Sequence, residues 1–235
     1  MKKLLSLSFL AAIMLFGACK KSSGPSNNAS VMFVYGCSGI NGNLSVTANN
    51  TPVPSAQNLT FLGTSGYQNI TSGSAVPISF NILGTTSGST APLTSGTASF
   101  TTGTDYSVFA SGSTAALSVF YTTDDLSAPA SGNAKIRLVN LSSDNLSLTG
   151  TTAASGSTTT NMFASGVNKT SISGFAQMPA GTYKILVEDT THATATSYIL
   201  PSQVLTAGKI YTILYTGING GGGSFGYIAT VITNK

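Results

Sequence analysis

Hydrophobic and polar residues alternate in short stretches along the chain after its N-terminal segment. In "KIRLVNL", Ile136 and Leu138 point to one side of an extended strand, while Lys135 and Arg137 point to the other. The stretch "IYTILYTG" repeats the pattern with tyrosine and isoleucine on one side. Clusters such as "TSGS", "PAGT", "TTGT" and "NGGGG" separate these stretches, as turns do. Because no stretch keeps a helical period over three turns, the pattern predicts short, half-buried β-strands.

The pattern of strands occurs twice. "ASVMFVYGCSG" at 29–39 aligns with "AKIRLVNLSSD" at 134–144, an offset of 105 (134 − 29). The same offset relates "ISFNILGTT" at 78–86 to "YKILVEDTT" at 183–191, and "GTDYSVFASG" to "GKIYTILYTG". A unit of about 100 residues is too long for a solenoid repeat and long enough to have a core of its own.

We therefore expect an all-β chain with two tandem antiparallel β-sandwich domains. The predicted boundaries are residues 29–125 for the first domain, 126–132 for a linker and 133–235 for the second domain. Short strands at regular spacing within about 100 residues are typical of immunoglobulin-like sandwiches. The Cys…Trp…Cys spacing of true immunoglobulin domains is absent, because the chain has no tryptophan.

The N-terminus predicts export and a lipid anchor. "MKKLLSLSFLAAIMLFGAC" has two lysines, an apolar run and small residues before Cys19, which is the order of a secretory signal peptide. The run is too short to be a spanning helix. The ending "LFGAC" resembles the lipobox of bacterial lipoproteins, which implies a signal peptide at 1–18 and lipidation of Cys19. An ordinary cleaved signal followed by an unrelated cysteine is the alternative.

The residues after Cys19 predict a tether and a membrane face. "KKSSGPSNNAS" is polar and has no apolar period, so residues 19–28 are expected to form a flexible tether. Surface-displayed lipoproteins of the Bacteroidetes often carry acidic residues just after the lipidated cysteine, and "CKKSSG" has none. This difference favours an outer-membrane lipoprotein that faces the periplasm, with surface exposure as the alternative. The membrane is then a partner through the N-terminal lipid.

Charged residues are scarce and unevenly distributed. They make up 7% of the chain, against about 25% in a typical domain, and the net charge is +4. Nucleic-acid binding needs a basic stripe, so we expect no nucleic-acid partner. The first half has three aspartates and no Lys or Arg, whereas the second has six Lys or Arg and three acidic residues. These opposite signs are compatible with docking of the halves or with orientation of the second half toward an anionic surface, and equally with charges that are simply scattered and solvated.

Few residues are arranged for catalysis or metal binding. His192 is the single histidine, and with Glu188 and Asp189 it offers at most a weak cation site on a polar loop. Those carboxylates are more simply interpreted as solvated. Cys37 has no second cysteine nearby, which is typical of a small buried hydrophobic residue rather than a redox group.

Two further motifs have non-catalytic interpretations. Asp124 and Asp125 could form an acid–base pair, but adjacent residues point apart, so we interpret them as the start of the linker that contains Pro129. The glycine-rich "TGINGGGGSFG" precedes the strand "YIATVIT" rather than a helix, which favours a hairpin loop over a phosphate-binding loop. We therefore expect no catalytic residue, no metal ligand and no cofactor.

One short motif indicates a modification. "DTT" at 189–191 resembles the O-glycosylation motif of the Bacteroidetes, in which an aspartate precedes Ser or Thr and a further apolar or Thr residue. The resemblance implies Thr190 as the acceptor in an exported protein.

The repeated unit resembles a known family. It opens with "AKIRLVNLSSD", passes through "YKILVED" and closes with "LTAGKIYTILYTG", which is similar to the bacterial family catalogued as domain of unknown function 4397. The resemblance is better over residues 133–217 than in the first half, where "YGCSG" replaces an Asn/His-led phrase that contains Asp. It implies a secreted or lipid-anchored β-sandwich module, often in tandem, with no established activity.

These observations favour a non-enzymatic, lipid-anchored cell-envelope protein that binds or scaffolds an envelope protein or a glycan. A carbohydrate-binding outer-membrane lipoprotein is the alternative, since neutral hydroxyl and amide groups suit sugars. The chain lacks tryptophan, and the aromatic residues at matched positions, Tyr67 with Phe175 and Tyr106 with Tyr211, are expected in the cores. A hydrolase would need an acid, base or metal set that the sequence lacks.

Overall fold

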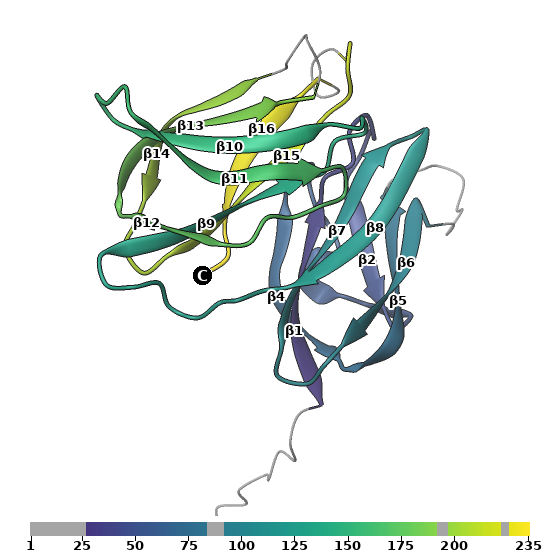
Figure 1. Ribbon diagram of the computed structural model, residues 1–235. Coiled ribbons are helices and arrows are strands. Elements are labelled where there is room, and N and C mark those ends of the chain that lie inside the picture. The colour runs from purple at the N-terminus through teal and green to yellow at the C-terminus, as the bar shows by residue number, and fades with distance from the viewer. Residues whose placement is uncertain (1–26, 84–91, 192–196, 222–225) are drawn as a thin grey trace, which may run out of the picture.

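The computed structural model describes residues 27–83, 92–191, 197–221 and 226–235 (Figure 1). The first half contains β1 (Asn28–Tyr35), β2 (Leu44–Ala48), β3 (Thr51–Pro52), the short 3-10 helix η1 (Pro54–Ala56), β4 (Thr64–Thr71), β5 (Gly73–Ile82), β6 (Thr94–Phe100), β7 (Asp105–Ser113) and β8 (Ala116–Thr123). The second half contains β9 (Asn133–Asn140), β10 (Ser147–Ala154), β11 (Thr160–Asn168), β12 (Ala176–Pro179), β13 (Gly181–Asp189), β14 (Tyr198–Leu205), β15 (Ile210–Thr216) and β16 (Ile228–Thr233).

The strands form four four-stranded sheets, two in each half. Sheet A has the order β4-β1-β7-β8 and sheet B the order β3-β2-β5-β6. In the second half, sheet C has the order β12-β9-β15-β16 and sheet D the order β11-β10-β13-β14. The expected all-β fold, with sheets made mostly of antiparallel strands, is confirmed. Among the described residues, no helix is long and apolar enough to cross a membrane.

Within these mostly antiparallel sheets, one pair of strands in each half is parallel. β1 pairs with β7 in parallel, with Ser30 opposite Asp105, and β9 pairs with β15 in parallel, with Lys135 opposite Ile210. Both residues of the second pair lie 105 positions after those of the first. The first strand and the next-to-last strand of each half therefore lie side by side in corresponding registers.

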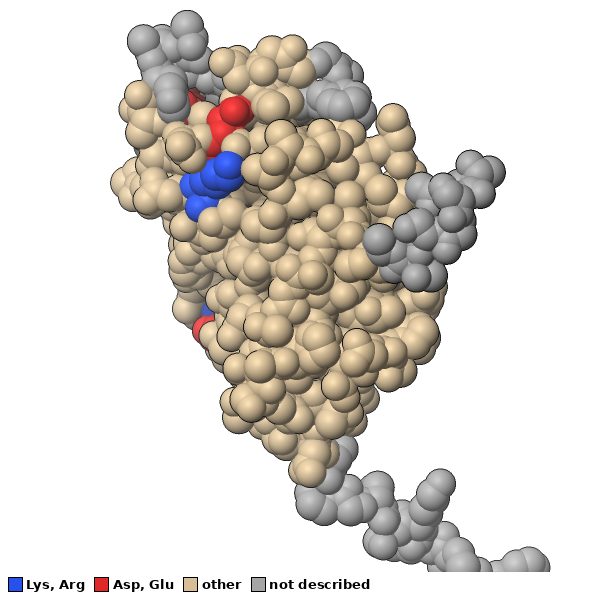
Figure 2. All heavy atoms as spheres, turned by 90° about the vertical axis from the view of Figure 1, so that its right-hand side faces the viewer, with Lys and Arg blue, Asp and Glu red and all other residues tan. Residues whose placement is uncertain are grey.

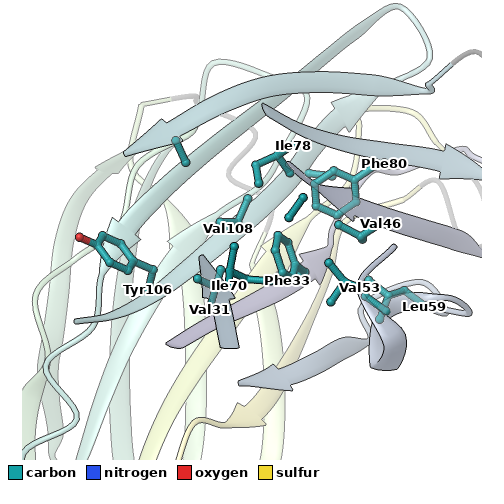
Figure 3. Packing of buried hydrophobic residues seen from close by; sticks show 14 of the residues in the cluster. Val31, Phe33, Val46, Val53, Leu59, Ile70, Ile78, Phe80, Tyr106 and Val108 are labelled. Carbon is teal, nitrogen blue, oxygen red and sulfur yellow. The ribbon is translucent and has the colours of Figure 1, made fainter. Parts of the chain in front are cut away.

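Three apolar clusters hold the sheets together. The first lies between sheets A and B, where Phe33 and Phe80 meet edge to face with ring centroids 6.3 Å apart (Figure 3). The second lies between sheets C and D and includes Leu138 and Ile185. The third joins the two halves through sheets A and C. The sheets thus stack in the order B, A, C, D.

The central strands are buried on both faces. In β1, Val31 and Phe33 point into the first sandwich, while the alternate residues Met32 and Val34 belong to the cluster between the halves. Strands that are covered on both faces have nearly continuous apolar sequences, as "VMFVY" does.

The same burial corrects the expectation for β9. Ile136 and Leu138 do point into the second sandwich, and Lys135 and Arg137 do point to the opposite face. That face was expected to be in solvent, but Lys135 is 5% exposed and Arg137 is 1% exposed. The strand is not half-buried, because the first half covers its charged face.

The stretch that is repeated most clearly forms the same local structure twice. The hydroxyl of Tyr106 accepts a hydrogen bond from the amide of Thr101 at 3.1 Å, and that of Tyr211 accepts one from the amide of Thr206 at 3.1 Å. Each tyrosine lies five residues after its donor and is buried at the start of its strand. This contact resembles the tyrosine corner of immunoglobulin-like sandwiches, and it gives the tyrosine near the start of β7 and of β15 the same structural role.

Candidate functional site

A set of polar side chains, most of them buried, lies where the two halves meet. Around it are apolar residues from both halves: Met32, Val34, Phe109, Val139, Leu141 and Leu214. The polar residues, which we call the interface network, are Tyr67, Ser107, Asp124, Arg137, Thr212 and Asn234. The first three come from the first half and the others from the second.

An ion pair forms the centre of the interface network. Arg137 Nη1 lies 2.7 Å from Asp124 Oδ1, and both side chains are buried. The guanidinium carbon of Arg137 lies 4.4 Å from the centroid of the Phe175 ring, a cation–π contact. Phe175 and its matched residue Tyr67 were expected in the separate cores; both instead contact this interface.

Three hydroxyl groups complete the hydrogen bonds around the ion pair. Ser107 donates to Asp124 Oδ2 at 2.6 Å and accepts from Arg137 Nη2 at 3.2 Å. Thr212 accepts from Arg137 Nε at 2.9 Å and donates to Asn234 at 2.7 Å.

Tyr67 donates to Asp124 Oδ2 at 2.5 Å and accepts from the Asn234 amide at 3.1 Å. Each hydroxyl therefore donates once and accepts once, and no buried side-chain nitrogen or oxygen in the described parts of the chain lacks a partner. Such a complete set of partners offsets the desolvation of the charges.

The electrostatic environment favours the protonated form of Tyr67. Burial raises the pKa of its hydroxyl well above the ordinary value, and the negative charge of Asp124 raises the pKa further. The group is thus a hydrogen-bond donor throughout the physiological range. Its role in the network is to hold a carboxylate rather than to exchange a proton.

A second ion pair closes the rim of the interface. Lys135 Nζ lies 2.7 Å from Asp125 Oδ2 and 2.8 Å from the hydroxyl of Ser127. Hydrogen bonds from Lys135 and Ser127 hold the pKa of the Asp125 carboxyl well below its usual range. The Asp125 side chain is 64% exposed, so this pair is far more solvated than that of Arg137 and Asp124.

These two pairs correct the interpretation of Asp124 and Asp125 as simple linker residues. The adjacent carboxylates do point apart, as expected, but each binds a cation of the second half. Of the alternatives left open for the opposite charges of the two halves, these four residues fit docking rather than a solvated scatter. The signal in the sequence was the placement of two cations on β9 and two anions after β8 in a chain with few charges.

The hydrogen bonds between the two halves are arranged with approximate twofold symmetry. The hydroxyls of Ser38 and Ser143, which are 105 residues apart, lie 3.3 Å from each other. Thr216 donates to the Gly36 carbonyl at 2.6 Å, and the amide of Gly112 donates to the Leu141 carbonyl at 3.4 Å. Gly36 and Leu141 are themselves 105 positions apart and directly follow β1 and β9. In each half, therefore, the carbonyl at the end of the first strand accepts a hydrogen bond from the other half.

The other predicted site residues fall in different places. Cys19 and His192 lie outside the described residues, as do the signal peptide and most of the tether. Cys37 is a free, fully buried thiol in the first core, where burial raises its pKa to about 12. This environment agrees with an inert hydrophobic role.

The carboxylates near His192 are not a solvated loop pair. Asp189 ends β13 and is 4% exposed, and its Oδ1 accepts hydrogen bonds from the amides of Ser147 and Thr191. Thr190 is exposed, and its hydroxyl donates to the Ser147 carbonyl at 3.1 Å. The described residues contain no group of three or more His, Cys, Asp or Glu side chains that could hold a metal ion.

The glycine-rich stretch connects two antiparallel strands, β15 and β16, as a hairpin loop does. The shorter connection between β7 and β8 occupies the equivalent place in the first half.

The surface has open, shallow hollows. One, of about 650 Å³, lies on the outer face of sheet B and is lined by Ser45, Thr47, Asn50, Ser79, Asn81, Ile82 and Pro92. Another, of about 290 Å³, lies beside η1 and the end of β4. The Met162 and Phe175 region of the second half borders a hollow of about 430 Å³.

Comparisons with solved structures give distant matches. A leucine-rich repeat protein from Bacteroides thetaiotaomicron VPI-5482 is 13% identical with a TM-score of 0.26, covering 80% of this chain and 26% of its own length, so the chain spans about a quarter of that protein. A candidate cell adhesion protein from Bacteroides ovatus is 12% identical with a TM-score of 0.30, covering 86% of this chain and 95% of its own. Another from Bacteroides eggerthii is 13% identical with a TM-score of 0.27, covering 89% and 96%. TM-scores this low support no argument about function.

The comparison with family models gives a direct assignment. None of the curated proteins matches the chain. The model described as "Domain of unknown function (DUF4397)" matches residues 30–149, which are more than half of the 235 residues. The match runs from β1 into β10, so the better match expected over 133–217 is not shown by this comparison. The residues that it covers establish that the chain belongs to the DUF4397 family.

Proposed function

We propose that the chain is a non-enzymatic, lipid-anchored protein of the cell envelope whose two sandwiches form one rigid binding or scaffolding module. The interface network is the observation that carries this proposal. The polar residues that the fold brings together, Arg137 and Asp124 above all, bind each other between the halves. Their chemistry joins two domains, which is what a scaffold requires.

The two halves are tandem copies of one module in this proposal. Their four sheets have corresponding strand orders, and their parallel strand pairs have registers that differ by 105 residues. The proposed boundaries remain 29–125 and 133–235, with 126–132 as the linker. β8 ends at Thr123 and β9 begins at Asn133, which supports a short connection.

The anchor and the location rest on the sequence. The signal at 1–18 and the lipidated Cys19 attach the chain to the outer membrane, and "CKKSSG" favours the periplasmic face. β1 begins at Asn28, so the tether of 19–28 leads almost directly into the first sandwich.

Cell fractionation tests the anchor, and crosslinking tests the scaffold. The native chain is compared with Cys19→Ala by protease treatment of intact cells and separation of the membranes. We expect the native chain to resist protease and to sediment with the outer membrane, and the variant to become soluble. Crosslinking should then capture a defined envelope neighbour of the native chain. A Cys19→Ala chain that stays in the outer membrane contradicts the anchor, and a native chain without any crosslinked neighbour contradicts the scaffold.

Carbohydrate binding is a second candidate function, and one observation favours it. The outer face of sheet B carries neutral hydroxyl and amide groups around the hollow of about 650 Å³, without a charged residue among those that line it. Sugars present many hydroxyl groups of the same kind. Binding of the full chain to a glycan array tests this candidate.

A further inference from the structure

The outer face of sheet B has a regular arrangement of polar side chains. We call it the hydroxyl face and define it by Ser45 and Thr47 on β2, Ser79 and Asn81 on β5, and Ser95 and Thr97 on β6. The residues that alternate with them, such as Val46 and Phe80, point into the first core. The six side chains therefore share the side of the sheet that faces away from the other half.

The strand registers place these side chains in rows. Thr47 lies opposite Ser79, which lies opposite Ser95, and Ser45 lies opposite Asn81. Adjacent strands are about 4.8 Å apart, and residues two apart along a strand are separated by about 6.8 Å. The groups are thus held at fixed spacing by the sheet, which reduces the entropy lost when a ligand binds them.

The hydrogen-bonding groups of this face are available to a ligand. None of the six side chains makes a hydrogen bond within the described part of the chain. Ser45, Thr47, Ser79 and Asn81 are half-buried, so their positions are restricted, and all four line the hollow. The volume of about 650 Å³ lies within the range of ligand sites, which is about 300–1,000 Å³.

The absence of charge selects the class of ligand. The described residues of the first half include no Lys or Arg, and of its three aspartates Asp124 and Asp125 pair with the second half. Figure 2 shows the side of the molecule that carries β5 and β6, where charged atoms occupy only small areas. An anionic or cationic ligand would gain no ion pair on this face, and an uncharged ligand would leave no charge unpaired.

The composition of the face distinguishes a glycan from a protein partner. Protein interfaces concentrate their binding energy in buried Trp, Tyr and Arg residues and contain little serine. The hydroxyl face contains none of those three residue types. Serine and threonine hydroxyls, one amide, and the apolar edges of Ile82 and Pro92 match the mixture of hydroxyl groups and C–H surfaces that a sugar presents.

The equivalent face of the second half is different, so the hydroxyl face is not a general feature of the fold. At the 105-residue offset, Ser79 corresponds to Lys184, and Asn81 corresponds to Leu186. Leu186 lies opposite Ile199, which is 50% exposed, on the outer face of sheet D. That face is charged and apolar where the first is neutral and polar.

From these observations we infer that the hydroxyl face is a binding site for an uncharged glycan. The inference rests on the second candidate function, carbohydrate binding, and assigns it to named residues. The neutral side chains of β2, β5 and β6 donate and accept hydrogen bonds with the sugar hydroxyls, and the sugar lies across the rows rather than in a deep pocket.

Exchange of residues between the two outer faces tests the site. The detergent-solubilised full chain is applied to β-glucan, mannan and chitin as uncharged glycans, and to polygalacturonate and heparin as charged ones. The variant Ser79→Lys/Asn81→Leu places the residues of the second half on the hydroxyl face. The matched control, Lys184→Ser/Leu186→Asn, makes the reverse exchange on sheet D.

We expect the native chain to bind at least one uncharged glycan and neither charged one. The Ser79→Lys/Asn81→Leu variant should lose at least about tenfold in affinity, while the control retains native affinity. If the double variant does not fold, as judged by thermal unfolding, Asn81→Asp adds one charge without a change of shape and should give the same loss.

Three results overturn the inference: no binding of any uncharged glycan, undiminished binding by the folded variants of the hydroxyl face, or an equal loss in the sheet D control. A chain that binds no glycan but keeps its crosslinked envelope neighbour refutes this inference and leaves the proposed scaffold intact. A chain that binds an uncharged glycan equally well through either face supports carbohydrate binding and refutes the assigned site.

Discussion

Arg137 and Asp124 lie on different halves of the chain, yet their Nη1 and Oδ1 atoms are 2.7 Å apart in a site where neither side chain is more than 2% exposed. Removal of one partner from a buried pair leaves the other charged, desolvated and unpaired, which costs about 3–5 kcal/mol. The stability of the two-sandwich unit thus depends on a pair that only its assembled form contains.

Residues from equivalent positions provide a test of this pair. Arg137 corresponds to Met32 at the 105-residue offset. Asp124 corresponds to Asn234 by structure, because each directly follows the last strand of its half and donates its amide to the first residue of the neighbouring strand. Arg137→Met should lower the free energy of unfolding by about 3–5 kcal/mol, because Asp124 stays buried without its cation. The double variant Arg137→Met/Asp124→Asn should recover most of that loss. Urea denaturation of the four chains gives the coupling energy. Additive single effects would contradict a direct interaction.

The neighbouring carboxylates should differ sharply in importance. Asp124→Asn leaves the buried Arg137 guanidinium without a countercharge, whereas Asp125→Asn affects a side chain that is 64% exposed. We expect the melting temperature to fall much more for Asp124→Asn than for Asp125→Asn. Differential scanning calorimetry of both variants in one buffer makes the comparison. Equal shifts would show that solvation does not determine the strength of the two pairs.

The close approach at Gly36 should not tolerate a larger residue. A Cβ atom added there would lie 2.3 Å from Leu141 Cδ1 and 3.2 Å from the Ala110 carbonyl oxygen. Gly36→Ala should therefore destabilise the chain by about 1–3 kcal/mol through overpacking of the interface. The Gly36→Ala/Leu141→Ala double variant should be more stable than the sum of the two single changes predicts. Chemical denaturation measures all four chains, and a neutral Gly36→Ala would contradict a tight interface at this position.

Alkaline conditions should destabilise the first core. Burial raises the pKa of the Cys37 thiol from 9.0 to about 12, and burial together with the nearby Cys37 raises the pKa of Tyr35 to about 12. Between pH 9 and 12 the unfolded chain releases protons that the folded chain keeps, so stability present below pH 9 is lost as pH rises.

Replacement of the thiol separates its contribution from that of tyrosine. Ionisation of Cys37 in the unfolded chain should lower the free energy of unfolding by an amount on the order of 4 kcal/mol by pH 12. In a Cys19→Ala background, Cys37→Ala should show a shallower decline of unfolding free energy over this range. A thiol reagent at pH 8 should label Cys37 only after denaturation. Rapid labelling of the folded chain would contradict its burial.

The strands were predictable from the sequence because apolar residues recur at every second position on the side of each strand that faces the core. Ile136 and Leu138 alternate with charged residues, and this alternation indicates correctly which residues face the second core. It does not show what covers the other side of β9, because a residue on a second buried face has the same spacing as one in solvent. The packing of sheet A on sheet C resolves this ambiguity.

The interface network was only partly predictable for a similar reason. Opposite net charges of the two halves were compatible with docking and equally with solvated charges, because the pairing of Arg137 with Asp124 depends on how two sheets lie against each other. The hydroxyl face is different. The alternation in "LSVTA" and "PISFNI" is sufficient to place Ser45, Thr47, Ser79 and Asn81 on one side of each strand, and only their alignment into rows needs the register.

The near-twofold contact between the halves also determines which modules can combine. Two first halves docked in this way would each set an Asp124 carboxylate against a Met32, and two second halves would each set an Arg137 against an Asn234. Both arrangements bury charges of one sign without a counterion, which is disfavoured by several kcal/mol. Only the mixed pair is neutral. The exchange of one methionine for arginine and one asparagine for aspartate thus makes each module selective for its covalent neighbour over identical modules of other chains.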